Sequence, residues 1–93
     1  MDSKIKILIA DDFALLREDM IELINKQPDM EVVGDASSGR EIVELAKKTE
    51  FDLILLDIEM EQMNAGILAA EKIKQEKPEG EIIFLTAHET KEV

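Results

Sequence analysis

Cysteine is absent from the 93 residues, and so are tryptophan and tyrosine. Without thiols the chain can form no disulfide, thiol nucleophile or Cys-ligated metal site, a composition that fits a cytoplasmic protein. Only three aromatic residues are present, too few to stack nucleic-acid bases. Basic residues are also scarce, because 11 Lys and Arg face 22 Asp and Glu. The net charge of −11 argues against binding nucleic acid or anionic membranes, and no apolar run approaches the roughly 18 residues of a membrane span.

Apolar residues make up 45% of the chain, which is enough for one small hydrophobic core. Four short apolar runs predict buried strands at residues 5–10, 31–34, 51–56 and 81–86. Three stripes with helical spacing lie between them: Leu16, Met20, Leu23 and Ile24; Ile42, Leu45 and Ala46; and Ala69, Ala70 and Ile73. Ser38 and Glu41 have the spacing of a capping box, which predicts the start of the second helix. Alternating strands and helices indicate an α/β domain with a parallel sheet.

Oxygen-bearing side chains stand where three of these strands end. Asp11 and Asp12 follow the first strand, Asp57 follows the third, and Thr86 closes the fourth. Ligands of such open sheets bind at the carboxyl ends of the strands, so we expect these groups to converge. Crowded carboxylates need a cation, and hard oxygen donors favour Mg²⁺, with Mn²⁺ or Ca²⁺ as substitutes. Any one of these residues taken alone is more often a helix cap or a turn residue than a ligand.

Three motifs together resemble the receiver domain of two-component response regulators. They are Ile-Leu-Ile-Ala-Asp-Asp at residues 7–12, Leu-Ile-Leu-Leu-Asp-Ile-Glu-Met at residues 53–60, and Leu-Thr-Ala at residues 85–87. Residues 30–36 and 39–41 are similar to the NarL/FixJ-type subfamily, whose receiver usually precedes a helix-turn-helix DNA-binding domain. The resemblance implies a flavodoxin-like, doubly wound parallel sheet with the strand order 2-1-3-4, the fifth strand being missing.

The resemblance also implies roles for residues at the sheet edge. Asp57 would accept a phosphoryl group from a sensor histidine kinase or a small acyl phosphate, as a signalling domain and not as an enzyme that turns over a substrate. Asp12, Asp57 and the backbone carbonyl of Glu59 would hold Mg²⁺, with Asp11 acting directly or through water. This placement would neutralise charge on the phosphoryl oxygens.

Two further residues follow the fourth predicted strand. By the same resemblance, the hydroxyl of Thr86 would donate a hydrogen bond to the phosphoryl group, and that movement would be the switch. Ala87 is small and would leave room for the phosphoryl group. Thr86 can also be explained as an ordinary β-branched strand residue.

The loop after Asp57 departs from the family pattern. Met60 is followed by Glu61 where the family usually has proline, and Gly66 arrives about one residue late. We therefore expect a longer loop at residues 61–65 that adds a carboxylate near the site. Asn64, Ala65 and Gly66 are typical of a turn before a helix.

The C-terminal part of the pattern departs further. The family expects a Lys at the end of a fifth strand, and neither Lys77 nor Lys91 occupies such a position. Residues 1–93 are thus expected to form a C-terminally incomplete receiver domain without its output domain. The fourth predicted strand would then be an exposed apolar edge, which favours self-association.

Two other functions remain open. Haloacid-dehalogenase-like phosphatases also place an aspartyl nucleophile after a hydrophobic strand, but they use Asp-x-Asp where this chain has Asp57, Ile58 and Glu59. The chain would otherwise be an interaction module with a vestigial acidic site. Mg²⁺ binding with stoichiometric phosphorylation distinguishes a receiver domain from both.

Overall fold

Strands and helices alternate strictly along the chain in the computed structural model, which describes residues 3–85. The elements are β1 (Ile5–Ala10), α1 (Ala14–Asn25), β2 (Met30–Ala36), α2 (Gly39–Lys48), β3 (Leu53–Asp57), α3 (Ala65–Glu76) and β4 (Glu81–Leu85). Within this part of the chain, the longest helices have 12 residues, and none has the length and hydropathy to cross a bilayer.

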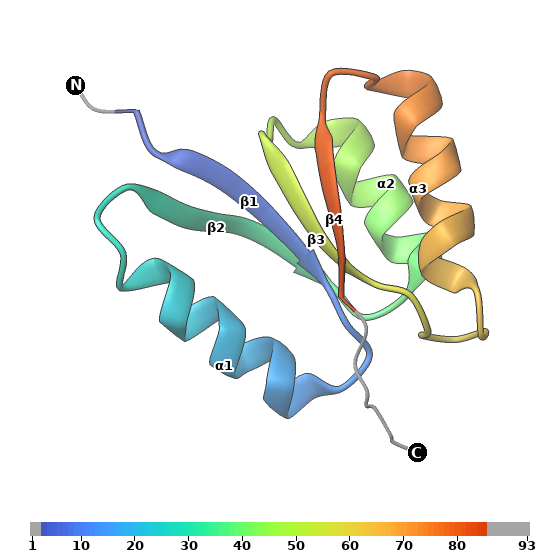
Figure 1. Cartoon of the computed structure of the whole chain (residues 1–93), viewed down its shortest axis with the longest axis horizontal. Coiled ribbons are helices and arrows are strands. Elements are labelled where there is room, and N and C mark those ends of the chain that lie inside the picture. The colour runs from blue at the N-terminus through green and yellow to red at the C-terminus, as the bar shows by residue number, and fades with distance from the viewer. Residues whose placement is uncertain (1–2, 86–93) are drawn as a thin grey trace, which may run out of the picture.

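The four strands form one parallel sheet in the order β2-β1-β3-β4, with α1 on one face and α2 and α3 on the other (Figure 1). The predicted α/β fold and strand order are confirmed. β1 and β3 are central and adjacent, and their register pairs Ala10 with Leu56. The residues that follow this pair are Asp11 and Asp57, so the register places the two carboxylates side by side at the carboxyl edge.

The main core lies between the sheet and the pair α2 and α3. Leu8, Ala10, Ile54 and Leu56 of the central strands are buried there. The helices contribute the predicted second and third stripes, with Ile42, Ala46, Ala69, Ala70 and Ile73 all buried. Because the stripe of α3 consists mainly of alanine, this helix can approach α2 closely.

The first predicted helix is present as α1, but its apolar stripe is only partly covered. No residue of α1 is buried, and Leu16 and Leu23 are 40% and 61% exposed. Arg17 contributes polar contacts instead, since its Nε donates to Asp35 at the end of β2 over 2.9 Å and its guanidinium also donates to the carbonyl of Asp11. Arg17, which does not belong to the apolar stripe, is therefore part of what joins the helix to the sheet.

The boundaries of two strands, β2 and β3, differ from those predicted. β2 extends from Met30 to Ala36, because its backbone continues to pair with β1 beyond the apolar run. β3 begins at Leu53 and not at residue 51, and it includes Asp57. β4 is described to Leu85, so the predicted strand end at Thr86 lies outside the described residues.

Candidate functional site

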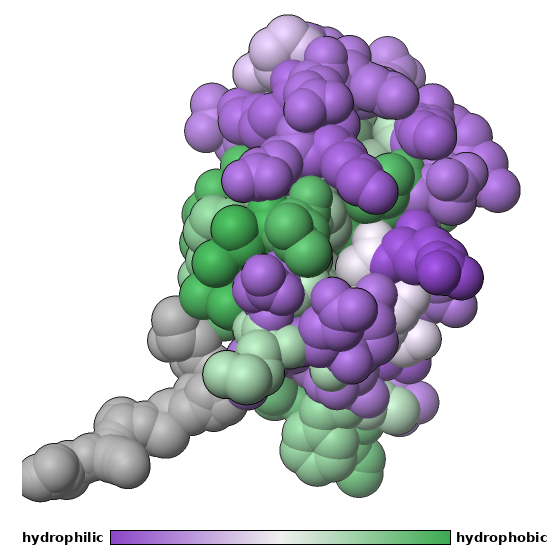
Figure 2. Space-filling model, turned by 90° about the vertical axis from the view of Figure 1, so that its right-hand side faces the viewer, coloured by the Kyte–Doolittle hydropathy of each residue, from purple (hydrophilic) through white to green (hydrophobic). Residues whose placement is uncertain are grey.

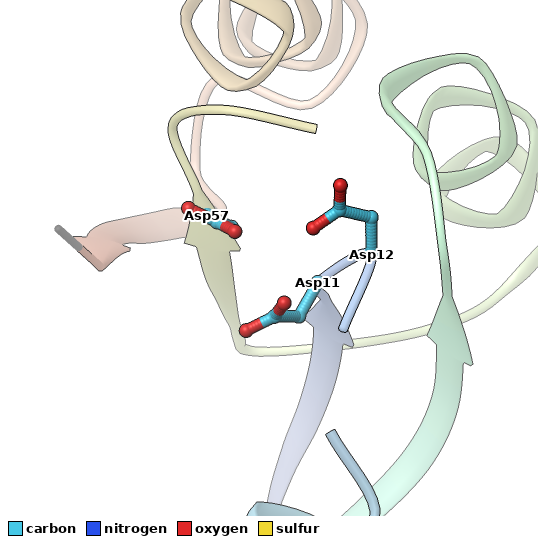
Figure 3. A group of neighbouring side chains, drawn as sticks. All are labelled: Asp11, Asp12 and Asp57. Atoms are coloured by element: carbon cyan, nitrogen blue, oxygen red, sulfur yellow. The ribbon is translucent and has the colours of Figure 1, made fainter. Parts of the chain in front are cut away.

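Three carboxylates meet at the carboxyl edge of the sheet. Asp11 follows β1 directly, Asp12 begins the loop to α1, and Asp57 is the last residue of β3. One oxygen from each lies within 4.8 Å of the others, and the side chains point into the space between the two strand ends (Figure 3). The convergence of Asp11, Asp12 and Asp57 that the sequence predicts is present in the structure.

Local hydrogen bonds orient two of these carboxylates. Asp11 Oδ1 accepts from the backbone N–H of Phe13 over 2.9 Å, which explains the tight turn into α1. Asp57 Oδ1 accepts a longer bond of 3.3 Å from the backbone N–H of Glu59. Asp11 and Asp57 are 3% and 7% exposed, whereas Asp12 is exposed. The site therefore has a buried floor and one carboxylate that faces solvent.

The electrostatics of the site disfavour the charged form of Asp57. Desolvation by burial and the neighbouring charges of Asp11 and Asp12 raise its pKa above the usual value, against a smaller opposing effect of the Glu59 N–H. Among residues 3–85, the ion pairs are Lys6–Glu50, Arg17–Asp35 and Lys47–Glu44. None of them neutralises the cluster.

The donor set fits a hard divalent cation. Three carboxylates supply oxygen ligands within the reach of one ion, and their mutual repulsion would be relieved by its charge. Mg²⁺ commonly uses one or two carboxylates and retains several waters, which suits a site with one exposed side. Asp11, Asp12 and Asp57 are the residues that would hold it.

The other predicted site residues are placed less completely. Glu59 lies in the loop after β3, with its side chain exposed and its N–H directed to Asp57. A role for its carbonyl as a metal ligand stays a prediction. Thr86 and Ala87 lie outside the described residues.

The carboxylate of Glu61 does not join the cluster of Asp11, Asp12 and Asp57. Its Oε1 accepts from the N–H of Gly39 over 2.7 Å and its Oε2 from the N–H of Arg40 over 3.2 Å, at the beginning of α2. Burial acts to raise the pKa of Glu61, but the bonds from the N–H groups of Gly39, of Glu61 itself and of Arg40 outweigh it, so this pKa is lowered. The sequence contained one signal for this contact, namely that Glu61 follows Met60 at the position where the family usually has proline.

The capping box predicted at Ser38 is confirmed in its first half. Ser38 is the N-cap of α2, and its hydroxyl accepts from the N–H of Glu41 over 3.1 Å. The carboxylate of Glu41 binds Ser37 instead of returning to Ser38. Hydrogen bonds from the backbone and side chain of Ser37 lower the pKa of Glu41.

The turn predicted before a helix is present at residues 63–64, and α3 follows it from Ala65, so Ala65 and Gly66 already belong to the helix. The N–H of Gly66 donates to the carbonyl of Ile58 over 2.7 Å. A Cβ at Gly66 would lie 2.1 Å from the carbonyl oxygen of Asp57. Gly66 thus permits the direct contact between α3 and the backbone of the site, even though it arrives late in the sequence.

Comparison with known proteins identifies the class of molecule to which this fold and site belong. The family model described as the response regulator receiver domain matches residues 7–93. The chain belongs to this family. It is therefore the receiver domain of a response regulator in two-component signalling, which leaves the dehalogenase-like phosphatase without support.

Individual relatives have different outputs. An uncharacterized transcriptional regulatory protein of Bacillus subtilis, YxjL, is 43% identical over 89 residues, covering 96% of this chain and 40% of that protein. A protein-glutamate methylesterase/protein-glutamine glutaminase of Thiobacillus denitrificans is 49% identical over 75 residues, covering 81% of this chain and 21% of that protein. The chain thus spans less than half the length of either.

The solved structures agree on the fold. The crystal structure of a LuxR-family two-component response regulator from Aurantimonas superimposes with a TM-score of 0.85 at 29% identity. The alignment covers 94% of this chain and 61% of that one. The response regulator domain of Thermotoga maritima CheB gives a TM-score of 0.83 at 39% identity, over 90% of this chain and 61% of that one.

The raised pKa of Asp57 predicts that Asp57→Asn stabilises the metal-free chain at neutral pH. A carboxyl group whose pKa is raised in the folded state favours folding when protonated, and this advantage is lost as the pH rises through the folded-state pKa. Thermal unfolding in a chelator should therefore show the variant melting higher than wild type at pH 7, with a smaller difference near pH 4. Each kcal/mol of difference corresponds to about 4–8 °C in a domain of this size.

Asp29→Asn is the control, because Asp29 is exposed in the loop before β2, at the opposite end of the sheet. It removes the same charge without relieving the cluster and should melt within a degree or so of wild type. Equal melting temperatures for Asp57→Asn and wild type across this pH range would contradict the repulsion inferred at the site.

Proposed function

We propose that Asp57 accepts a phosphoryl group from a sensor histidine kinase in a reaction that depends on Mg²⁺. The observation that carries this proposal is the position of Asp57, a nearly buried carboxylate that faces Asp11 and Asp12 at the ends of adjacent strands. Membership of the receiver family supports the same assignment.

The chemistry follows from the geometry of the cluster. A carboxylate oxygen of Asp57 forms a bond to phosphorus while the P–N bond of a phosphohistidine breaks and its electron pair returns to the imidazole nitrogen. Bound Mg²⁺ would offset the repulsion between the acidic cluster and the incoming phosphoryl oxygens. The N–H of Glu59 orients one oxygen of Asp57, which leaves its other oxygen for the attack.

The intact protein should test this function with a small acyl phosphate as donor. We expect the mass to increase by one phosphoryl group only in the presence of Mg²⁺, the group to map to the peptide with Asp57, and hydroxylamine to remove it. Continuous hydrolysis of many equivalents of donor would indicate a phosphatase. An unchanged mass under all conditions would indicate an interaction module with a vestigial site.

Mg²⁺ binding gives a second prediction. Asp12→Ala removes the exposed carboxylate of the cluster and should weaken Mg²⁺ binding by on the order of 10–100-fold, since even groups outside the direct ligand set have effects of that size. Titration followed by NMR of the backbone amides measures the affinity. Asp29→Ala changes the net charge equally, outside the cluster, and should bind Mg²⁺ as wild type does. An unchanged affinity in Asp12→Ala would exclude Asp12 as a ligand.

We propose that the phosphorylated domain controls a transcriptional output. The support is similarity to transcriptional regulatory proteins, namely YxjL and, at 36% identity over 88 residues, DegU of Brevibacillus brevis. A methylesterase output, as in the Thiobacillus denitrificans relative, is the second candidate. Phosphorylation-dependent protection of promoter DNA by the intact protein would support the first and exclude the second.

Self-association of a peptide of residues 1–93 is a further prediction. Within residues 3–85, β4 pairs only with β3, and Ile83 and Phe84 are 50% and 42% exposed. Figure 2 shows a patch of hydrophobic surface, in green at the left of the view, next to hydrophilic surface in purple. An apolar edge of this kind pairs with other chains. Static light scattering should show a mass that rises with concentration, and Ile83→Lys should lower it; a monomer at all concentrations would contradict the prediction.

A further inference from the structure

Hydrogen bonds hold the loop between β3 and α3, residues 58–64, both at its base and at its outer side. At its base, the N–H of Gly66 donates to the carbonyl of Ile58 over 2.7 Å. At its outer side, the carboxylate of Glu61 accepts the two hydrogen bonds from Gly39 and Arg40. We infer that Glu61 is a positioning residue of the phosphoacceptor site, which holds this loop against α2; the inference rests on the function proposed above.

The first turn of α2 explains why Glu61 is needed. The first backbone N–H groups of a helix have no acceptor within it. In α2, Ser38 provides acceptors for Glu41 through its hydroxyl and for Ile42 through its carbonyl. The N–H groups of Gly39 and Arg40 are bound by Glu61, which lies 22 and 21 residues further along the chain. One carboxylate therefore completes the cap of α2 and ties the loop to it.

The contact between loop and helix is also close in a steric sense. A Cβ at Gly39 would lie 3.0 Å from the carbonyl oxygen of Ala65 and 3.3 Å from Oε2 of Glu61. A groove of about 470 Å³ opens beside this contact, and it is lined by α2, by α3 and by Glu61 and Gln62 of the loop. Because residues 61–64 are exposed, the loop has space to shift once the bonds to α2 are lost.

The fastened loop includes the backbone that reaches Asp57. Glu59 stands two residues before Glu61, and its N–H donates to Asp57 Oδ1 over 3.3 Å. Between them, Met60 is buried in the core at 9% exposure. The orientation of the Glu59 peptide is thus set by the two residues that follow it, Met60 through its burial in the core and Glu61 through its hydrogen bonds to α2. Loss of the cap should move that peptide relative to Asp57.

The experiment compares Glu61→Ala and Glu61→Gln with Ser38→Ala in the intact protein. Ser38→Ala is the matched control, because it removes another cap of the same helix turn without touching the loop. All three variants should unfold at lower temperature. In NMR spectra of the metal-free protein, only the Glu61 variants should shift the amide resonance of Glu59. Their Mg²⁺ affinity should fall several-fold, and that of Ser38→Ala should stay within twofold of wild type.

Glu61→Gln separates the effect of losing the charge of Glu61 from the effect of losing its hydrogen bonds to α2. Its amide oxygen can still accept from Gly39, so the Glu59 shift and the Mg²⁺ affinity should lie between those of wild type and Glu61→Ala. An unmoved Glu59 resonance in both Glu61 variants would overturn the inference, whatever the metal does. Absence of any Mg²⁺ response or phosphorylation in wild type would instead refute the proposed function, while the metal-free spectra still decide the role of Glu61.

Discussion

Gly66→Ala is expected to lower the free energy of unfolding of the domain by about 3 kcal/mol or more, a large effect for the addition of one methyl group. The new Cβ would lie 2.1 Å from the carbonyl oxygen of Asp57 and 2.8 Å from Cα of Ile58. Both atoms belong to the backbone, so no side-chain rotation can relieve the overlap. Either α3 moves away from the sheet or the end of β3 is displaced, and each breaks packing around the site. Chemical denaturation measures the loss.

Gly34→Ala provides the matched control for this substitution. Its Cβ would meet only methyl groups, at 3.0 Å on Leu8 and 3.1 Å on Leu45. Side chains can yield by a few tenths of an ångström, so we expect a cost of roughly 1 kcal/mol. If both variants unfold at the same denaturant concentration, the contact between α3 and the backbone of Asp57 is less rigid than the structure indicates.

The features that the sequence predicted correctly depend on local patterns and on one geometric rule. Continuous apolar runs identify β1 and β3, and the helical spacing of Ile42, Ala46 and Ile73 identifies the buried faces of α2 and α3. Parallel strands end at the same edge, so Asp11 and Asp57 converge without knowledge of any side-chain contact. The cluster of carboxylates was predictable because strand ends position its members.

The features that were missed depend on contacts between distant segments. The cap of α2 by Glu61 spans 22 residues, and no periodic pattern reports a pairing of that kind. The extra residue before Gly66 was expected to lengthen the loop toward the site. In the structure, α3 begins at Ala65, and Gly66 in its first turn lies against the carbonyl of Asp57. In α1, the apolar spacing identified Leu23, which is largely exposed. Arg17, which is not part of that apolar pattern, makes a polar contact with Asp35 instead.

Asp57→Asn should abolish phosphorylation of the intact protein by a small acyl phosphate in the presence of Mg²⁺. The lone pair of an amide nitrogen is delocalised and its oxygen is uncharged, so asparagine cannot act as the nucleophile. Because the same change is expected to raise the stability of the metal-free chain at pH 7, unfolding cannot explain the loss. Intact-mass spectrometry measures the result.

Two controls make this prediction specific to Asp57. Asp29→Asn changes the same group at the opposite end of the sheet and should be phosphorylated at the wild-type rate. Asp12→Asn weakens the cation site but leaves the acceptor, so its phosphorylation should slow by roughly 10²–10³ and still map to Asp57. A full phosphoryl increment on Asp57→Asn would show that a neighbouring carboxylate is the true acceptor, and Asp11 or Asp12 would then take the role assigned to Asp57.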